Sequence, residues 1–179
     1  GLIGLRLVAG NPDHFARVVI ANTGLPTGHE RVAKAFQSWL EFSQNTPDFD
    51  AAAIVSFSTV TDVAPEALAA YNAPFPDDTY KAGARAFPAL VPISPEDPAS
   101  AANVAAREVL SSWTKPFLTL FSDQDPVTAG SDRWFQDNVP GAAGQPHQTL
   151  TGGGHFLQED LGPELARLVA DFAGVTTSA

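Results

Sequence analysis

Residues 116–126 read PFLTLFSDQDP, an apolar run that ends in a group of polar residues. A short, continuous apolar run of this kind is typical of a strand that is buried on both faces of a parallel sheet. Residues Arg17–Asn22 form a similar run bounded by Thr23-Gly24, and a weaker strand is predicted at His147–Leu150. The sequence therefore predicts a small parallel sheet of three strands.

Helical periodicity dominates the part of the chain between the first two predicted strands. Further helices are predicted there at 65–71 and 78–91, after an apolar stripe that contains Val32, Phe36, Trp39 and Leu40. Turn residues are concentrated on both sides of this block, which is typical of a lid inserted into a sheet scaffold. We therefore predict a core segment at 1–24, a helical cap at 25–95 and a second core segment at 96–179.

Other helices are predicted next to the strands, at 1–10, 100–113 and 131–138, and at the end of the chain. The closing helix carries one apolar face, formed by Leu157, Leu161, Leu165, Leu168 and Phe172. Strands that alternate with helices imply an α/β fold with crossover connections. Such sheets usually have more than three strands, and the chain contains no methionine, even at position 1. We therefore expect a longer protein whose upstream part supplies the remaining strands.

Composition excludes several classes of function. The chain has 179 residues, of which 44% are hydrophobic, so it is long enough to bury a core. Its net charge is −10, which disfavours nucleic acid as a partner. No apolar stretch approaches the roughly 20 residues that cross a bilayer, so the sequence predicts no membrane partner. We expect a cytoplasmic location, although the lack of cysteine leaves the redox compartment open. The absence of cysteine excludes thiolate nucleophiles, and we expect neither a metal nor a cofactor.

Two polar residues follow consecutive predicted strands. Asp125 comes after the strand at 116–121, and His155 follows the strand at 147–150 and three glycines. Ligand sites of parallel sheets lie at the carboxyl ends of the strands, and a histidine held by a carboxylate can act as a base near neutral pH. Taken singly, Asp125 could cap a helix and His155 could be an ordinary loop residue. Together they have the acid-then-histidine order of an α/β-hydrolase triad.

The segment GGGHFLQED at 152–160 resembles the histidine segment of haloalkane dehalogenases, and SDQDPV at 122–127 resembles the acid segment of the same superfamily. Residues 21–28 and, in the cap, residues 71–77 and 80–88 are also similar to that family. Residues 1–6 resemble the helix that directly follows its nucleophile. The resemblance implies the C-terminal part of an α/β-hydrolase fold, with a parallel sheet, flanking helices and an inserted helical cap.

The resemblance also implies a mechanism. An aspartate displaces halide from a saturated carbon, and water activated by a histidine hydrolyses the resulting ester. His155 would be that base and Asp125 its orienting acid, whereas the nucleophile is absent from this chain. Trp39 would bind the halide, and the substrate pocket would contain Phe36, Phe87, Pro88 and Val91. Trp39 and these pocket residues could equally be ordinary packing within the cap. The partners would be a small halogenated alkane and water, with halide ion as a product.

Several alternatives remain open on the sequence. An epoxide hydrolase or a serine esterase has the same fold, although the cap contains only Tyr71 and Tyr80 as tyrosines, which disfavours the former. The chain could also be a non-catalytic fragment. Asp123 is a rival for the acid role, but its spacing fits the superfamily less well. We expect structural or surface roles for the other candidate side chains, which are Trp113, Trp134, His14, His29 and His147.

Overall fold

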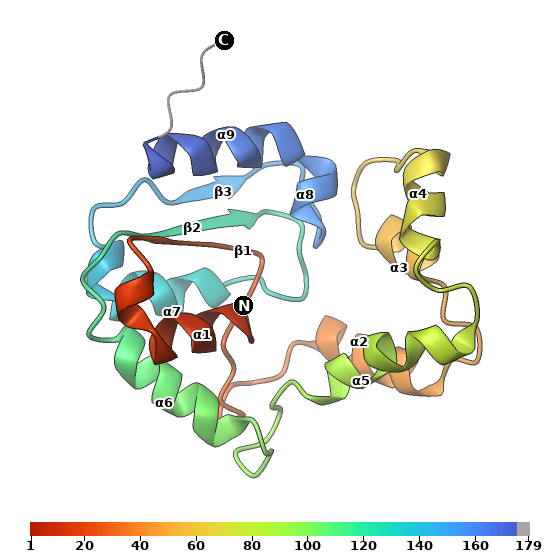
Figure 1. The fold of residues 1–179 in the computed structure, drawn as a ribbon, viewed down its shortest axis with the longest axis horizontal. Coiled ribbons are helices and arrows are strands. Elements are labelled where there is room, and N and C mark those ends of the chain that lie inside the picture. Colours follow the sequence, from red (N-terminus) through yellow and green to blue (C-terminus); the bar gives the residue numbers. More distant parts are fainter. Residues whose placement is uncertain (175–179) are drawn as a thin grey trace.

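The computed structural model describes residues 1–174 and contains a parallel three-stranded sheet with helices on both faces (Figure 1). The strands are β1 (Val18–Ala21), β2 (Phe117–Ser122) and β3 (Gln148–Leu150), in the order β1-β2-β3. Their registers pair Val18 with Phe117 and Leu120 with Gln148. The predicted α/β class is confirmed, and each predicted strand is found at or within one residue of its expected position.

The central strand β2 separates two apolar clusters because its side chains alternate between the two faces of the sheet. Phe117 and Phe121 pack into one cluster, while Leu118 and Leu120 pack into the other. The first cluster is completed by helices α1 (Gly4–Gly10), α6 (Ser100–Leu110) and α7 (Ser131–Asn138). The second is completed by α8 (Leu157–Asp160) and α9 (Gly162–Ala173). All six residues of β2 are buried, as expected for a strand covered on both faces.

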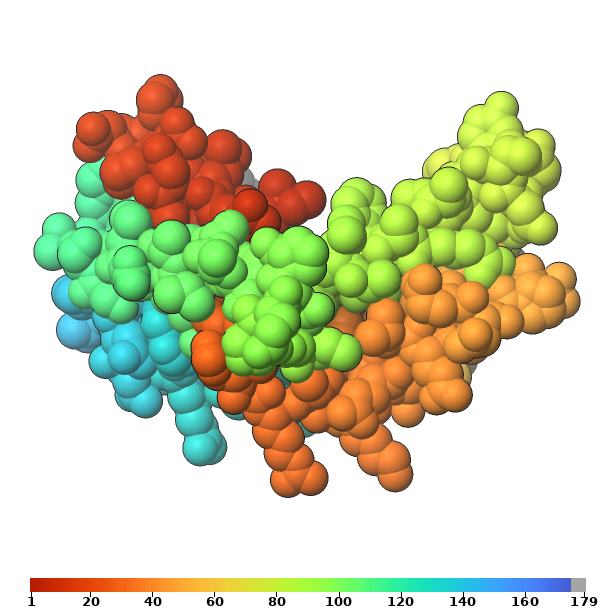
Figure 2. Space-filling model, turned by 90° about the horizontal axis from the view of Figure 1, so that it is seen from below, coloured from red at the N-terminus to blue at the C-terminus, as the bar shows by residue number. Residues whose placement is uncertain are grey.

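A block of helices lies beside the sheet rather than on either face of it (Figure 1). It consists of α2 (Lys34–Asn45), α3 (Ala51–Phe57), α4 (Pro65–Asn72), the 3-10 helix η2 (Asp78–Lys81) and α5 (Ala82–Ala89). Within it, α2 packs against α5 and α3 against α4. Seen from below, the surface is hollowed between α1 in red and the yellow-green segment that contains α5 (Figure 2). The exact limits of the cap at 25 and 95 stay a prediction, and residues 175–179 of the second core segment lie outside the described chain.

Arg85 on α5 binds α5 to the C-terminal end of α2 and to the residues directly after it. Its guanidinium donates to the carbonyl oxygens of Ser43 at 3.3 Å, Thr46 at 2.7 Å and Pro47 at 3.0 Å, all at the end of α2. The same group lies over the ring of Phe49, 5.0 Å from its centroid. A planar guanidinium presents several donors in fixed directions, so this one arginine binds three carbonyl groups at and just beyond a helix C-terminus.

The structure departs from the predicted helices in several places. Helix α1 begins at Gly4 rather than at residue 1, and α6 ends at Leu110 rather than at residue 113. The closing helix is interrupted at Leu161, whose φ of −131° and ψ of 33° are not helical, because Pro163 lacks an N–H and begins a new helix instead. The helix expected at 78–91 starts as the 3-10 turn η2 and ends at Ala89. Helix α3 was not predicted, although Asp50 caps it by accepting from Ala53 N at 3.0 Å.

Two short 3-10 helices complete the described chain, η1 (Pro12–His14) after α1 and η3 (Pro140–Ala142) before β3. Within residues 1–174, no helix is both long enough and apolar enough to cross a membrane.

Candidate active site

Asp125 lies just beyond the carboxyl end of β2 and is only 3% exposed. Its Oδ1 accepts from Val127 N at 2.8 Å, and its Oδ2 accepts from the backbone and the hydroxyl of Thr128. Burial by itself raises the pKa of Asp125, but hydrogen bonds from His155 and Thr128 outweigh it and leave the pKa below its ordinary value. The carboxylate is therefore ionised and fixed in one orientation. Asp125 does not cap the following helix, because α7 begins at Ser131 and has no side-chain cap, but the carboxylate binds the turn at Val127 and Thr128 and the histidine at the same time.

His155 comes from the loop after β3, and its Nδ1 lies 3.1 Å from Asp125 Oδ1. An ionised carboxylate only accepts hydrogen bonds, so Nδ1 carries the proton and a neutral ring keeps its lone pair on Nε2. Nε2 makes no hydrogen bond to any other residue within 1–174, and the side chain is 32% exposed. The arrangement can therefore accept a proton at Nε2 and stabilise the resulting imidazolium through Asp125.

The glycine loop before His155 begins with a backbone conformation that favours glycine. Gly152 has a φ of +89°, which favours glycine, and its N–H donates to Asp123 Oδ1 at 2.8 Å. Asp123 thus binds the start of the loop, and it is Asp125 that reaches the histidine ring. The sequence analysis preferred Asp125 to Asp123 as the acid partner of the histidine, and the Asp125–His155 hydrogen bond supports that preference.

Asn22 joins the carboxyl ends of all three strands and was not singled out by the sequence analysis. Its Nδ2 donates to Ser122 Oγ at 2.8 Å, Gly154 O at 2.8 Å and His155 O at 3.1 Å, while its Oδ1 accepts from Ser122 N at 2.9 Å. It also has a positive φ of 37°, a conformation that asparagine tolerates better than most residues. The only signal in the sequence was an asparagine at the end of a buried strand, in front of Thr23-Gly24.

A cavity of about 410 Å³ lies between the core and the cap. Phe36 and Val91 line it from the cap side, and Asn22, Val127 and Thr128 line it from the ends of the strands. The structure therefore brings two of the four predicted pocket residues to one cavity, next to the loop that carries Asp125. An apolar cavity with a few polar groups is the usual form of a small-molecule site.

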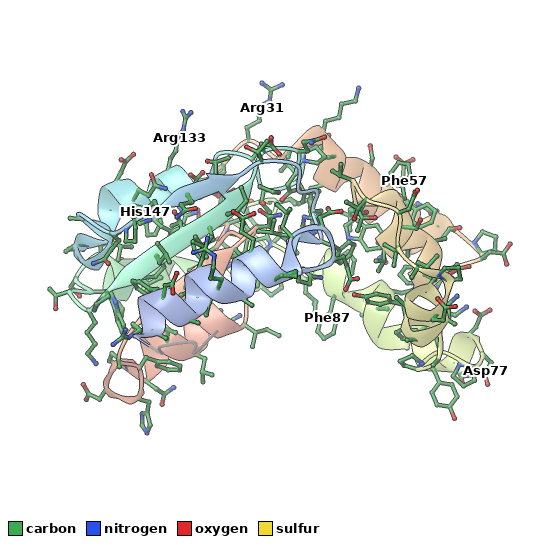
Figure 3. All side chains as sticks on the ribbon, turned by 90° about the horizontal axis from the view of Figure 1, so that it is seen from above. Arg31, Phe57, Asp77, Phe87, Arg133 and His147 are labelled. Atoms are coloured by element: carbon green, nitrogen blue, oxygen red, sulfur yellow. The ribbon has the colours of Figure 1, made fainter. Side chains whose placement is uncertain are left out.

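Trp39, Phe87 and Pro88 do not line that cavity. The Trp39 ring lies 6.0 Å from the rings of both Phe42 and Phe49, in an aromatic group within the cap. Pro88 is buried inside α5, whereas Phe87 is 60% exposed and projects from the helix into open space (Figure 3). The halide-binding role of Trp39 and the pocket roles of Phe87 and Pro88 stay predictions.

The chain shares extensive sequence with known enzymes. It is 56% identical over 172 residues to a haloalkane dehalogenase of Psychrobacter cryohalolentis and 51% identical over 168 residues to one of Mycobacterium marinum. These alignments cover 96% and 94% of this chain. The chain belongs to the haloalkane dehalogenase family. It spans about 57% of the length of the first of these relatives and 56% of the second. No established family model matches it.

Solved structures of haloalkane dehalogenases share the fold. The enzyme of Paraglaciecola agarilytica superimposes with a TM-score of 0.83 at 23% identity, covering 98% of this chain and 57% of that one. The enzyme DatA of Agrobacterium tumefaciens gives 0.75 at 21% identity, over 97% of this chain and 63% of that one. The α/β-hydrolase fold that the sequence motifs implied is therefore confirmed for this member of the dehalogenase family.

The remaining histidines and tryptophans of this dehalogenase relative, apart from Trp134, lie outside the cavity. The His147 ring lies between Thr119 and Ala142, with Nδ1 3.1 Å from Thr119 N and Nε2 2.9 Å from Ala142 O, at the end of the sheet far from the cap (Figure 3). Trp113 is buried in the core. Trp134 lines the cavity together with Arg107, whose guanidinium lies 4.4 Å from the ring centroid. The structural roles expected for His147 and Trp113 stay predictions.

Proposed function

We propose that the full-length protein carrying this chain is a haloalkane dehalogenase that works through an alkyl ester of an upstream aspartate. The observation that carries the proposal is the His155–Asp125 hydrogen bond at the ends of β3 and β2, in a chain of this family. The substrate would be a small halogenated alkane that enters the cavity beside these loops. Water is the second substrate, and no metal or cofactor is required.

The first step forms a bond between a carboxylate oxygen of the aspartate and the halogen-bearing carbon. The carbon–halogen bond breaks, and the halide leaves with the bonding electron pair. An indole N–H is a donor without acceptor capacity, so the proposed role of Trp39 is to stabilise that anion. His155 takes no part in this half of the reaction.

The second step is hydrolysis of the ester. His155 Nε2 removes a proton from water, and the water oxygen attacks the carbonyl carbon of the ester. The bond between that carbon and the alkoxide oxygen then breaks, and the imidazolium of His155 gives its proton to the departing oxygen to form the alcohol. The carboxylic acid that remains on the aspartate releases one proton to solvent, which restores the carboxylate. Asp125 stabilises the imidazolium during the attack, which is why its buried, ionised state matters.

The two steps can be separated with His155→Ala in the full-length protein. We expect this variant to release about one equivalent of halide from a short 1-haloalkane and then stop, because the ester forms but is not hydrolysed. Intact-mass analysis should show the protein heavier by one alkyl group. The matched control is His14→Ala, at an exposed position far from the site, which should turn over normally.

Two results would overturn the proposal. Normal turnover by His155→Ala would remove the histidine from the mechanism. A wild-type protein that releases no halide but hydrolyses epoxides or carboxylic esters would assign the chain to the alternative chemistries of this fold.

A further inference from the structure

The carboxylate of Asp160 connects the histidine loop to the cap. Its Oδ2 accepts from Gly154 N at 2.7 Å, directly before the histidine. On its other side, Oδ1 accepts from Val60 N at 2.9 Å, Thr61 N at 2.8 Å and Thr61 Oγ1 at 2.7 Å. These partners belong to the loop between α3 and α4, which faces α8 in Figure 1. One side chain therefore bonds two segments about a hundred residues apart.

The same two segments are also in direct backbone contact. His155 N donates to Ser58 O at 3.0 Å, so the base of the proposed reaction is tied to the cap by its own backbone. A Cβ at Gly154 would lie 2.6 Å from Ser58 O and 3.2 Å from Asp160 Oδ2, which leaves no room for a side chain. The approach of the cap loop to the histidine loop thus depends on glycine at this position.

The charge of Asp160 is balanced by backbone dipoles. Burial raises the pKa of Asp160, but hydrogen bonds from Thr61 and Gly154 outweigh this effect and leave the pKa below its ordinary value. Within residues 1–174 no Lys, Arg or His forms an ion pair with it. An isosteric amide would turn an NH₂ group towards N–H donors, so Asp160→Asn removes acceptors without changing side-chain size.

We propose that Asp160 is a positioning residue for His155. Asp160 fixes the histidine loop against the cap segment Ser58–Thr61, so the position of the cap and the position of the base depend on each other. The inference rests on the proposed dehalogenase function. Asp160 makes no hydrogen bond to the imidazole or to Asp125, so its effect on the histidine passes through the backbone of Gly154.

The proposed mechanism supplies a readout that mere loss of fold would not mimic. Displacement of halide needs the upstream aspartate but not His155, whereas ester hydrolysis needs the histidine in place. Loss of positioning should therefore slow hydrolysis and leave the first halide burst intact. Loss of folded protein would instead lower the burst amplitude and the steady-state rate together.

The test uses Asp160→Asn in the full-length protein with a short 1-haloalkane, followed by rapid-quench halide measurement. We expect kcat to fall roughly ten- to hundredfold, the range seen when a reacting group is misplaced by a fraction of an ångström to an ångström. The burst should stay near one equivalent, and the alkyl-enzyme should accumulate. Glu164→Gln on α9 is the matched control, because it removes one exposed carboxylate without a side-chain hydrogen bond within residues 1–174.

Thr61→Val gives a milder test in case Asp160→Asn does not fold. It removes the hydroxyl donor and leaves the Thr61 backbone bond, so we expect a two- to fivefold fall in kcat. Because Thr61 and Asp160 are in contact, the two substitutions should combine less than additively.

Amide hydrogen exchange gives an outcome that does not depend on activity. Exchange at Gly154, Val60 and Thr61 should speed up in Asp160→Asn and stay unchanged in Glu164→Gln. Unchanged exchange, or a kcat equal to that of Glu164→Gln, would overturn the positioning role. If the wild type releases no halide while the exchange result holds, the failure lies in the proposed reaction, and the role for His155 in it falls as well.

Discussion

The sheet and the cap of this chain are stabilised in different ways. Every residue of β2 is buried between two apolar clusters, whereas the cap exposes large side chains such as Phe57, at 92%, and Leu90, at 62%. The cap buries only a small apolar group, which includes Phe49 and Val55, and it also has two polar anchors, Arg85 within it and Asp160 between it and the histidine loop. The acid and the histidine are therefore placed by loops at the ends of buried strands, whereas a few hydrogen bonds fix the cap segment that lies against the histidine loop. Substitutions in the core and in the cap should therefore have different effects on activity and stability.

The largest effect is expected where the core places the acid. In the full-length protein, Asp125→Asn keeps the side-chain shape but removes the acceptor that fixes the His155 tautomer and stabilises the imidazolium. We expect kcat for halide release to fall about a thousandfold or more, as found when the acid of a serine-protease triad is changed in the same way. Steady-state halide assays measure this directly.

Asp123→Asn is the control, since Asp123 binds Gly152 N rather than the histidine ring. Asp123→Asn should lower kcat for halide release by less than tenfold. Equal losses in the two variants would mean that Asp125 has no special part in the reaction.

The second effect concerns stability. Leu120 is fully buried in β2, so Leu120→Ala should lower the free energy of unfolding by about 2–5 kcal/mol through lost burial and a cavity. Phe57→Ala removes a larger side chain from the cap surface, yet it should change that free energy by less than about 0.5 kcal/mol if the ring stays exposed in the full-length protein. Urea unfolding of both variants gives the comparison, and a large cost at Phe57 would show that another part of the protein covers it.

The sequence predicted the core better than the cap, because burial leaves a pattern in the sequence and isolated hydrogen bonds do not. A buried parallel strand such as 117–122 leaves a continuous apolar run, and the acid and histidine follow from where such strands end. Cap anchors leave no comparable pattern. Arg85 and Asp160 act on backbone groups of segments distant in sequence, as Asn22 does within the core, and polar residues of this kind leave no pattern in a single sequence. The break at Leu161 could have been anticipated from Gly162-Pro163, since proline begins a helix more readily than it continues one.

A third, smaller effect should be confined to the cap. Arg85→Lys retains the charge but loses the planar set of donors to Thr46 and Pro47, which leaves carbonyl groups at the end of α2 without partners. We expect a cost of about 1–2 kcal/mol in local stability. Hydrogen exchange should rise in α2 and α5, while amides of β2 exchange as in the wild type. Faster exchange throughout the sheet would contradict the separation of the two regions.

The smallest expected effect is a pH dependence of the contact between cap and core. The pKa of Asp160 is lowered in the folded state, so its hydrogen bonds contribute stability above the unfolded carboxyl pKa, near 3.9. That contribution is lost as pH falls through the folded pKa, because protonation removes acceptor charge. The urea midpoint of the wild type should exceed that of Asp160→Asn at pH 7, and the difference should shrink steadily towards pH 3. A difference that stays constant over this range would mean that the carboxylate charge of Asp160 contributes nothing to the contact between the cap and the core.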